Sequence, residues 1–141
     1  MLELRPAVFS DAPAIAPLLA ELGYPATADD VLQRLNVLAS IDRGVVLVAS
    51  DDAGIVGTAH ANLLPVLHSS DRFAQLVLIV VAERARRRGV GQMLVAACEG
   101  WAKAQGCTRM LITSGEERHE AHAFYEAMGY HHYARRFSKR F

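Results

Sequence analysis

The sequence Arg86-Arg87-Arg88-Gly89-Val90-Gly91 links the two segments that determine the fold. Residues 76–81, before it, are all leucine, isoleucine or valine, which predicts a central β-strand buried on both faces. Residues 89–105 repeat apolar side chains at helical spacing and are followed by Gly106, which predicts a long amphipathic helix. A buried strand therefore passes through a glycine turn directly into a helix.

The backbone of this turn is suited to bind a diphosphate. The first N–H groups of a helix have no partner inside the helix and carry the positive end of its dipole. A side chain at Gly89 or Gly91 would stand between these amides and a phosphate oxygen, and the arginines add positive charge. From the turn alone, a solvent-exposed basic loop stays open as an alternative. The predicted phosphate-binding residues are Arg86, Arg87, Arg88, Gly89, Val90, Gly91 and Gln92.

Two common phosphate-binding motifs are excluded by the residues that follow the turn. A P-loop needs lysine and then serine or threonine after its last glycine, but Gln92 and Met93 follow Gly91. A dinucleotide-binding fingerprint needs a third glycine at the position of Leu94. The turn therefore belongs to another class of phosphate site.

The spacing of apolar residues and the capping residues in the rest of the chain predict its other helices and strands. Ser10 is expected to cap a first helix that ends at Gly23, and Thr27, with Asp29 and Asp30 in the first turn, to start a second one. Predicted strands cover residues 2–8, 45–49, 55–64, 73–81, 110–113 and 130–137, and a last helix covers residues 119–128. This order predicts an α/β fold with a mixed central sheet of about six to seven strands flanked by about four helices.

Composition limits the function classes. The 141 residues, 52% of them hydrophobic, suit a single domain over residues 1–141. Fifteen basic residues balance fifteen acidic ones, so we expect no nucleic-acid partner. No apolar run is long enough to span a membrane, and Cys98 and Cys107 do not form a disulfide framework, so we expect a cytoplasmic protein without a membrane partner.

Two motifs in order resemble the GNAT family of N-acetyltransferases. Arg86, Gly89 and Gly91 match the family's Gln/Arg-x-x-Gly-x-Gly/Ala signature after a central strand. Residues 121–130, AHAFYEAMGY, are similar to its Ala-x-x-Phe-Tyr-x-x-x-Gly-Phe/Tyr helix. The element order agrees with the family over essentially the entire chain. The resemblance implies the GNAT fold and acyl-CoA-dependent N-acetyltransferase activity.

The resemblance also implies where acetyl-CoA binds. Backbone groups of the strand at Ile79, Val80 and Val81 would pair with the pantetheine arm, and the turn at 86–91 would hold the pyrophosphate. Tyr125 would contact the cofactor and protonate the leaving thiolate, because a phenol keeps its proton at neutral pH. The sequence departs from the family at Arg118, often asparagine there, so no cofactor role is assigned to Arg118.

Acetyl transfer also requires a group that accepts a proton from the amine. The candidates are Glu83, Glu116, His119 and His68, of which Glu83 joins Tyr125 as a predicted catalytic residue, although relatives often have proline there. The N–H around Val81 is a candidate oxyanion donor. Neither cysteine has a predicted base beside it, so we expect direct attack through a tetrahedral intermediate. His119 and His122 lack a third ligand, so no metal is expected.

The acceptor is predicted to be the primary amine of a small molecule. Asp71, Glu83 or Glu116 would receive its ammonium group, and Arg72 or Arg118 an anionic group on the same molecule. Acetylation of a protein or peptide amine, and a non-catalytic acyl-CoA sensor, remain alternatives. The last predicted strand would be a sheet edge, which makes a homodimer a further expectation.

Overall fold

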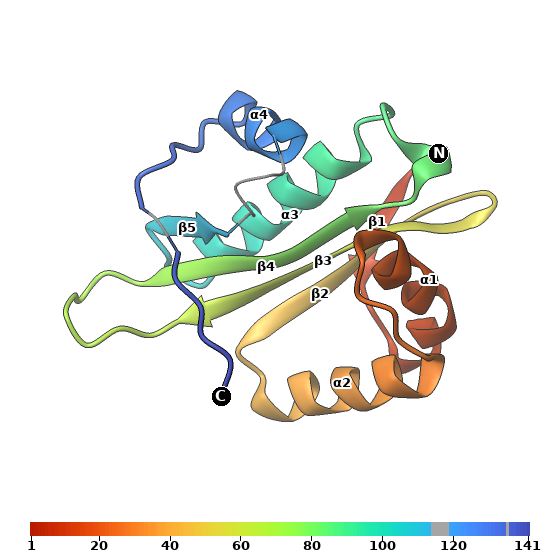
Figure 1. Ribbon diagram of the computed structural model, residues 1–141, viewed down its shortest axis with the longest axis horizontal. Helices are drawn as coiled ribbons and strands as arrows, with labels where there is room; N and C mark the ends of the chain where they lie inside the picture. Colours follow the sequence, from red (N-terminus) through yellow and green to blue (C-terminus); the bar gives the residue numbers. More distant parts are fainter. Residues whose placement is uncertain (114–118, 135) are drawn as a thin grey trace. The chain divides into compact units, whose positions relative to one another are not determined.

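A computed structural model describes residues 1–113, 119–134 and 136–141. The chain divides into two compact units, Met1–Leu111 and Ile112–Phe141, and each is described by itself. The first unit contains helices α1 to α3 and nearly all of the sheet, and the second contains helix α4 (Figure 1).

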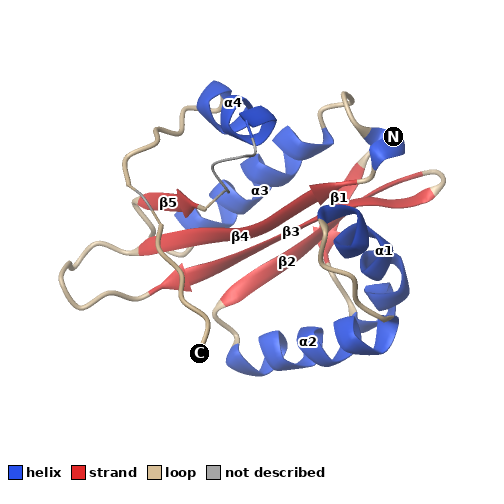
Figure 2. Cartoon of the chain, viewed as in Figure 1, coloured by secondary structure: helices blue, strands red, loops and turns tan. Residues whose placement is uncertain are grey.

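One five-stranded sheet has the strand order β1-β2-β3-β4-β5 (Figure 2). Neighbouring strands from β1 to β4 are antiparallel, so the long strands form consecutive hairpins. The register places Ala59 of β3 opposite Leu47 of β2 and Ile79 of β4. The strands are β1 (Glu3–Pro6), β2 (Gly44–Asp51), β3 (Gly54–Leu64), β4 (Phe73–Val81) and β5 (Arg109–Ile112).

Local signals start and end the helices largely as predicted. Thr27 forms a capping box before α2: its hydroxyl accepts from the Asp30 N–H at 3.0 Å, and its N–H donates to the Asp30 carboxylate at 2.9 Å. The positive φ angles of Gly23 and Gly106 accompany the ends of α1 and α3. The helices are α1 (Ala12–Leu22), α2 (Ala28–Ile41), α3 (Val90–Ala104) and α4 (His119–Ala127).

The helices of the first unit cover opposite faces of its sheet. Val46, Val48 and Leu78 share one face and pack against apolar residues of α1 and α2. On the other face, Leu94 and Val90 of α3 lie against β3. Since strand residues alternate between faces, each strand in the middle of the sheet contributes to both cores.

Two predictions about secondary structure were wrong. Ser10 does not cap α1, because residues Phe9–Asp11 form a 3₁₀ turn and Asp11 stands at the N-cap position. Residues 130–134 and 136–137 form no strand, and the sheet has five strands rather than the six to seven predicted. Tyr133 and Phe137 are 71% and 91% exposed, so the aromatic side chains of the predicted strand are not buried against a sheet. Within the described residues there are four α-helices, in agreement with the prediction.

In the second unit, helix α4 is followed by residues 130–134 and 136–141, which form neither helix nor strand. Within it, α4 ends before Gly129, whose φ is +93°. The N–H of Tyr130 donates to the carbonyl of Tyr125 at 3.1 Å, which closes the helix end. Among the described residues of the whole chain, no helix is long and apolar enough to cross a membrane.

Candidate active site

The turn before α3 has the geometry of an anion-binding helix start. Gly89 is the N-cap residue, and the first hydrogen bond of the helix runs from the Met93 N–H to the Gly89 carbonyl at 3.1 Å. By their position, the amides of Val90, Gly91 and Gln92 therefore have no acceptor inside the helix. They carry the positive end of the dipole of a 15-residue helix.

Two residues of this turn have left-handed backbone conformations. The φ angles of Arg87 and Gly89 are +65° and +79°. Glycine adopts this conformation without cost, whereas an arginine does so rarely. A β-carbon added at Gly89 would meet no heavy atom within 4 Å, so the space beside this amide is open. Backbone conformation, more than crowding, therefore explains the glycine at position 89.

An aspartate at the end of β2 forms ion pairs with one arginine before the turn and one within it. Asp51 Oδ2 accepts hydrogen bonds from Arg88 Nη1 at 3.0 Å and from Arg84 Nη1 at 3.2 Å. The hydrogen bond from Arg88 is the main cause that lowers the pKa of Asp51 to about 2. Arg88, predicted as a phosphate ligand, thus has an intramolecular partner, and it is exposed like Arg86 and Arg87.

The strand before the turn offers a backbone edge. The Ala82 N–H donates to the Val56 carbonyl at 2.7 Å, and N–H directions alternate along an antiparallel pair, so Ile79 and Val81 direct their backbone groups away from β3. On that side, β5 has four residues, and Thr108 before it bonds Arg72, before the start of β4. Within the first unit, β5 therefore borders only the first half of β4.

A bulge lies at this half of the strand. The register between β3 and β4 shifts between His60 and Ala61, which pair with Leu78 and Leu76, so Val77 is an extra residue in β4. Val77 is 47% exposed, although the sequence predicted burial on both faces. Bulges re-aim backbone groups and are frequent beside active sites.

Glu83 lies between the strand and the turn. It is exposed and begins the 3₁₀ turn Glu83–Ala85. Its N–H donates to Glu21 Oε1, near the end of α1, at 3.3 Å. A carboxylate that the sequence analysis did not name, that of Glu21, therefore contacts the backbone of the predicted base residue.

The other predicted residues are placed as follows. Tyr125 lies on α4 in the second unit, where its ring meets those of Phe124 and Tyr130 edge to face, with centroids 5.3 and 6.2 Å away. His68 is exposed in the segment between β3 and β4. Glu116, Arg118 and the side chain of His119 lie outside the described residues. The roles of Tyr125 and Glu83 stay predictions.

The buried cysteine, Cys98, does not have the surroundings of a catalytic nucleophile. Cys98 is fully buried on α3, and burial raises the pKa of its thiol to about 11. A protonated, buried thiol is a poor nucleophile, which agrees with the interpretation of Cys98 as a core residue. Cys98 and Cys107 are not bonded to each other. Within residues 1–113, 119–134 and 136–141, no three metal-ligating side chains come together.

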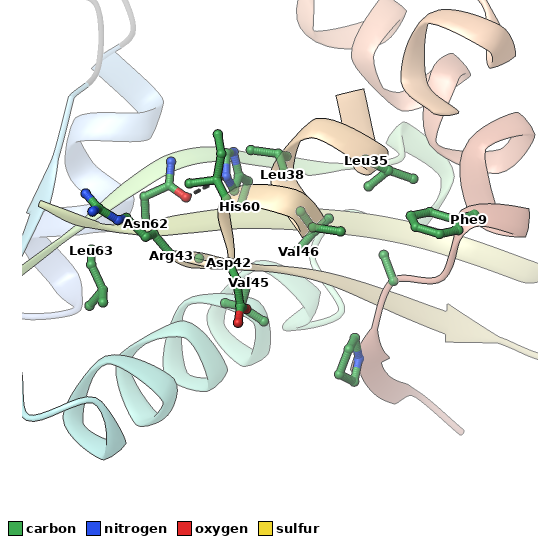
Figure 3. A pocket seen from close by; sticks show the side chains of 15 residues that line it. Phe9, Leu35, Leu38, Asp42, Arg43, Val45, Val46, His60, Asn62 and Leu63 are labelled. Atoms are coloured by element: carbon green, nitrogen blue, oxygen red, sulfur yellow. Dashed lines mark hydrogen bonds between the residues drawn. The ribbon is translucent and has the colours of Figure 1, made fainter. Parts of the chain in front are cut away.

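A cavity of about 400 Å³ lies between α2 and the strands β2 and β3 (Figure 3). Its side chains are mainly apolar and include Leu35, Leu38 and Val46. On its β3 wall, His60 and Asn62 point toward one another, with His60 Nε2 3.0 Å from Asn62 Oδ1. Burial lowers the pKa of His60, although the bond to Asn62 opposes this effect. Both residues lie on β3, two positions apart and therefore on one face.

Comparison with known proteins agrees with this geometry. The sequence profile described as "Acetyltransferase (GNAT) family" matches residues 13–130, from α1 to the end of the α4 motif. The chain belongs to the GNAT acetyltransferase family. The resemblance seen in the Arg86 to Gly91 turn and the residues 121–130 is thereby confirmed.

This GNAT acetyltransferase has relatives among known proteins and solved structures. It is 30% identical over 131 residues to an aminoglycoside N(6')-acetyltransferase type 1 of Stenotrophomonas maltophilia, covering 90% of this chain and 84% of the relative. Its fold matches a structure described as a transcriptional regulator from Bacillus halodurans C-125 (TM-score 0.92, 21% identity, all of both chains). It also matches the aminoglycoside N-acetyltransferase AAC(6')-Iy in complex with CoA (TM-score 0.88, 22% identity, 99% of this chain and 94% of that one).

Four site features of this GNAT acetyltransferase escaped the sequence analysis: Asp51, Glu21 and the pair His60 and Asn62. Asp51 is 33 and 37 residues from its arginine partners, and nothing in the sequence joins such distant residues. The spacing of His60 and Asn62 in a predicted strand was a usable signal, because alternate strand residues share a face.

Proposed function

We propose that this protein is an N-acetyltransferase that moves the acetyl group of acetyl-CoA to a primary amine of a small molecule. The observation that carries the proposal is the continuity of two features in the first unit. The outward backbone edge of β4 at Ile79 and Val81 leads, within ten residues, into the amides at the start of α3. An extended arm that ends in a diphosphate matches this path, and CoA has that shape.

The residues of β4 and of the turn before α3 fit acetyl-CoA, the acetyl donor. The outward N–H and C=O groups of Ile79 and Val81 would pair with the amides of the pantetheine arm, as an added strand does. Val80, between them, directs its backbone to β3 and supports the edge. The amides of Val90, Gly91 and Gln92 would hold the pyrophosphate, with Arg86 and Arg87 as exposed cations beside it. The solved relative AAC(6')-Iy, which holds CoA, supports this assignment by analogy.

The proposed reaction needs a general base, an oxyanion donor and a general acid from the protein. Glu83, whose backbone N–H is held by the Glu21 carboxylate, would accept a proton from the ammonium group, directly or through a water. The neutral nitrogen would attack the thioester carbonyl carbon, and an N–H near Val81 would stabilise the oxyanion of the tetrahedral intermediate. As the C–S bond breaks, Tyr125 would give its phenol proton to the thiolate. The products are an acetamide and CoA with a free thiol.

The small-molecule acceptor is supported by the relative from Stenotrophomonas maltophilia, whose name describes acetylation of an aminoglycoside. Acetylation of a protein amine and a non-catalytic acyl-CoA sensor remain the alternatives. A sensor would bind acetyl-CoA and release no thiol with any amine. A protein acetyltransferase would release thiol with peptides and not with small amines.

The test is calorimetric titration of the purified protein with acetyl-CoA and CoA, followed by thiol release with a panel of small amines and lysine peptides. We expect micromolar binding of both CoA species and thiol release that depends on a small amine. A wild-type protein that binds neither CoA species would refute the proposed function.

A further inference from the structure

The cavity between α2 and the sheet is a second candidate ligand site in the first unit. It borders β3, the strand next to the one that carries the proposed donor edge. Its lining joins β1, α2, β2 and β3, and in the register His60 on its wall lies opposite Leu78 of β4. Leu78 packs against the same apolar cluster as Val46. Adjacent strands are about 4.8 Å apart, so the His60 wall of the cavity lies one strand away from β4, whose opposite side is the proposed donor edge.

The polar pair inside the cavity is held by the backbone around it. A β-carbon at Gly44 would collide with Asn62 Oδ1 and the Ala61 carbonyl, so glycine at this position lets the Asn62 amide lie against β2. The amide oxygen is only an acceptor, and His60 Nε2 therefore carries the hydrogen. In the neutral imidazole, Nδ1 then remains as an acceptor for another group.

The charges of the lining point to one class of ligand. The lining contains one carboxylate, Asp42, and one guanidinium, Arg43, which offset one another. An aminoglycoside carries several ammonium groups and would need several carboxylates to replace their hydration. The remaining lining is mainly aliphatic, with the ring of Phe9 at one end (Figure 3).

We infer that this cavity binds the acceptor of the proposed acetyl transfer, and that the acceptor is a primary amine carried on an uncharged aromatic or branched aliphatic body. The apolar wall of Leu35, Leu38 and Val46 receives the body. His60, oriented by Asn62, accepts a hydrogen bond from the ligand and is a specificity-determining residue. The inference rests on the proposed function for the reaction, whereas the binding of the amine stands on the cavity alone.

Two adjacent positions of α2 provide a matched pair of variants. Leu38 lines the cavity, whereas Val37 is 56% exposed and does not line it. Leu38→Trp should fill the cavity, and Val37→Trp adds the same side chain outside it. A third variant, His60→Phe, keeps a ring at that position and removes the acceptor nitrogen.

The experiment uses 2-phenylethylamine as the apolar probe and kanamycin as the polycationic one. Binding of each is measured by calorimetry, and acetylation by thiol release. For the wild-type protein, we expect kcat/KM to be at least about tenfold higher with 2-phenylethylamine than with kanamycin. Leu38→Trp should raise the Kd of 2-phenylethylamine by about tenfold or more and leave the Kd of acetyl-CoA unchanged. His60→Phe should raise the Kd about tenfold, as expected for one lost hydrogen bond, and Val37→Trp should change neither constant.

The outcomes separate the inference from the proposed function. Preferred acetylation of kanamycin that Leu38→Trp leaves unchanged would overturn the inference and keep the acetyltransferase. Wild-type protein that neither binds nor acetylates 2-phenylethylamine would overturn it as well. Binding of 2-phenylethylamine that Leu38→Trp abolishes, in a protein that does not bind acetyl-CoA, would support the cavity site and refute acetyl transfer. Should Leu38→Trp fail to fold, His60→Phe, which keeps an aromatic ring at that position, decides the same question.

Discussion

Replacing Gly89 by aspartate and by asparagine separates charge from backbone geometry at the proposed pyrophosphate site. The residue has φ +79°, and an added β-carbon would meet open space. Asparagine and aspartate tolerate the left-handed conformation better than other side chains, and each should cost about 1 kcal/mol of stability. We therefore expect both variants to fold, with melting temperatures lowered alike by roughly 4 °C.

The two variants should differ in their affinity for CoA. A carboxylate about 5 Å from one phosphate charge is repelled by about 3 kcal/mol at an effective dielectric constant of about 20. This energy corresponds to a rise of about 100-fold in Kd for Gly89→Asp relative to Gly89→Asn. The gap should narrow in about 1 M salt, where the Debye length is about 3 Å.

The assay is calorimetric titration with CoA at low and high salt, with circular dichroism melting of each variant as the control for folding. Equal Kd values for the aspartate and asparagine variants at low salt would refute the reasoning. Such a result would mean that no phosphate group lies near the Gly89 amide.

Three more predictions test other parts of the molecule. Tyr125→Phe should lower kcat by about 100-fold or more and leave the Kd of acetyl-CoA within about twofold, as expected for a lost general acid; wild-type kcat would assign thiolate protonation elsewhere. Asp51→Asn should be less stable than wild type at neutral pH, because the depressed pKa of Asp51 stabilises the fold above its ordinary value of 3.8; this contribution is lost as the pH falls toward about 2. Urea unfolding from pH 7 to 2 checks this, and a gap that stays constant would exclude the Asp51 carboxylate as its source. Leu94→Ala, at a fully buried position of α3, should lower the free energy of unfolding by about 2–5 kcal/mol in urea titration, and a loss below about 1 kcal/mol would contradict the tight packing of α3 on β3.

Local sequence determined most elements and the position of the turn. The side-chain oxygens of Thr27 and Asp30 accept hydrogen bonds from backbone N–H groups three residues away, so four consecutive residues suffice to fix the start of α2. Gly89 supplies a conformation that glycine favours, and its place between strand and helix was readable from hydrophobic periodicity. These features depend on neighbours in the chain, and sequence patterns report such neighbours directly.

The tertiary structure decided what depends on distant residues. Asp51 meets Arg84 and Arg88 only because the β2–β3 hairpin brings its turn to the start of α3, and this contact gives Arg88 a partner that the motif did not suggest. The extra residue at Val77 depends on the pairing of β4 with β3, and the predicted last strand is absent where its aromatic residues Tyr133 and Phe137 are exposed. The His60 and Asn62 cavity needs α2 to lie over β2 and β3. Pairing and burial join residues far apart in the chain, so local sequence patterns determined most of the elements and their order, and packing determined the site.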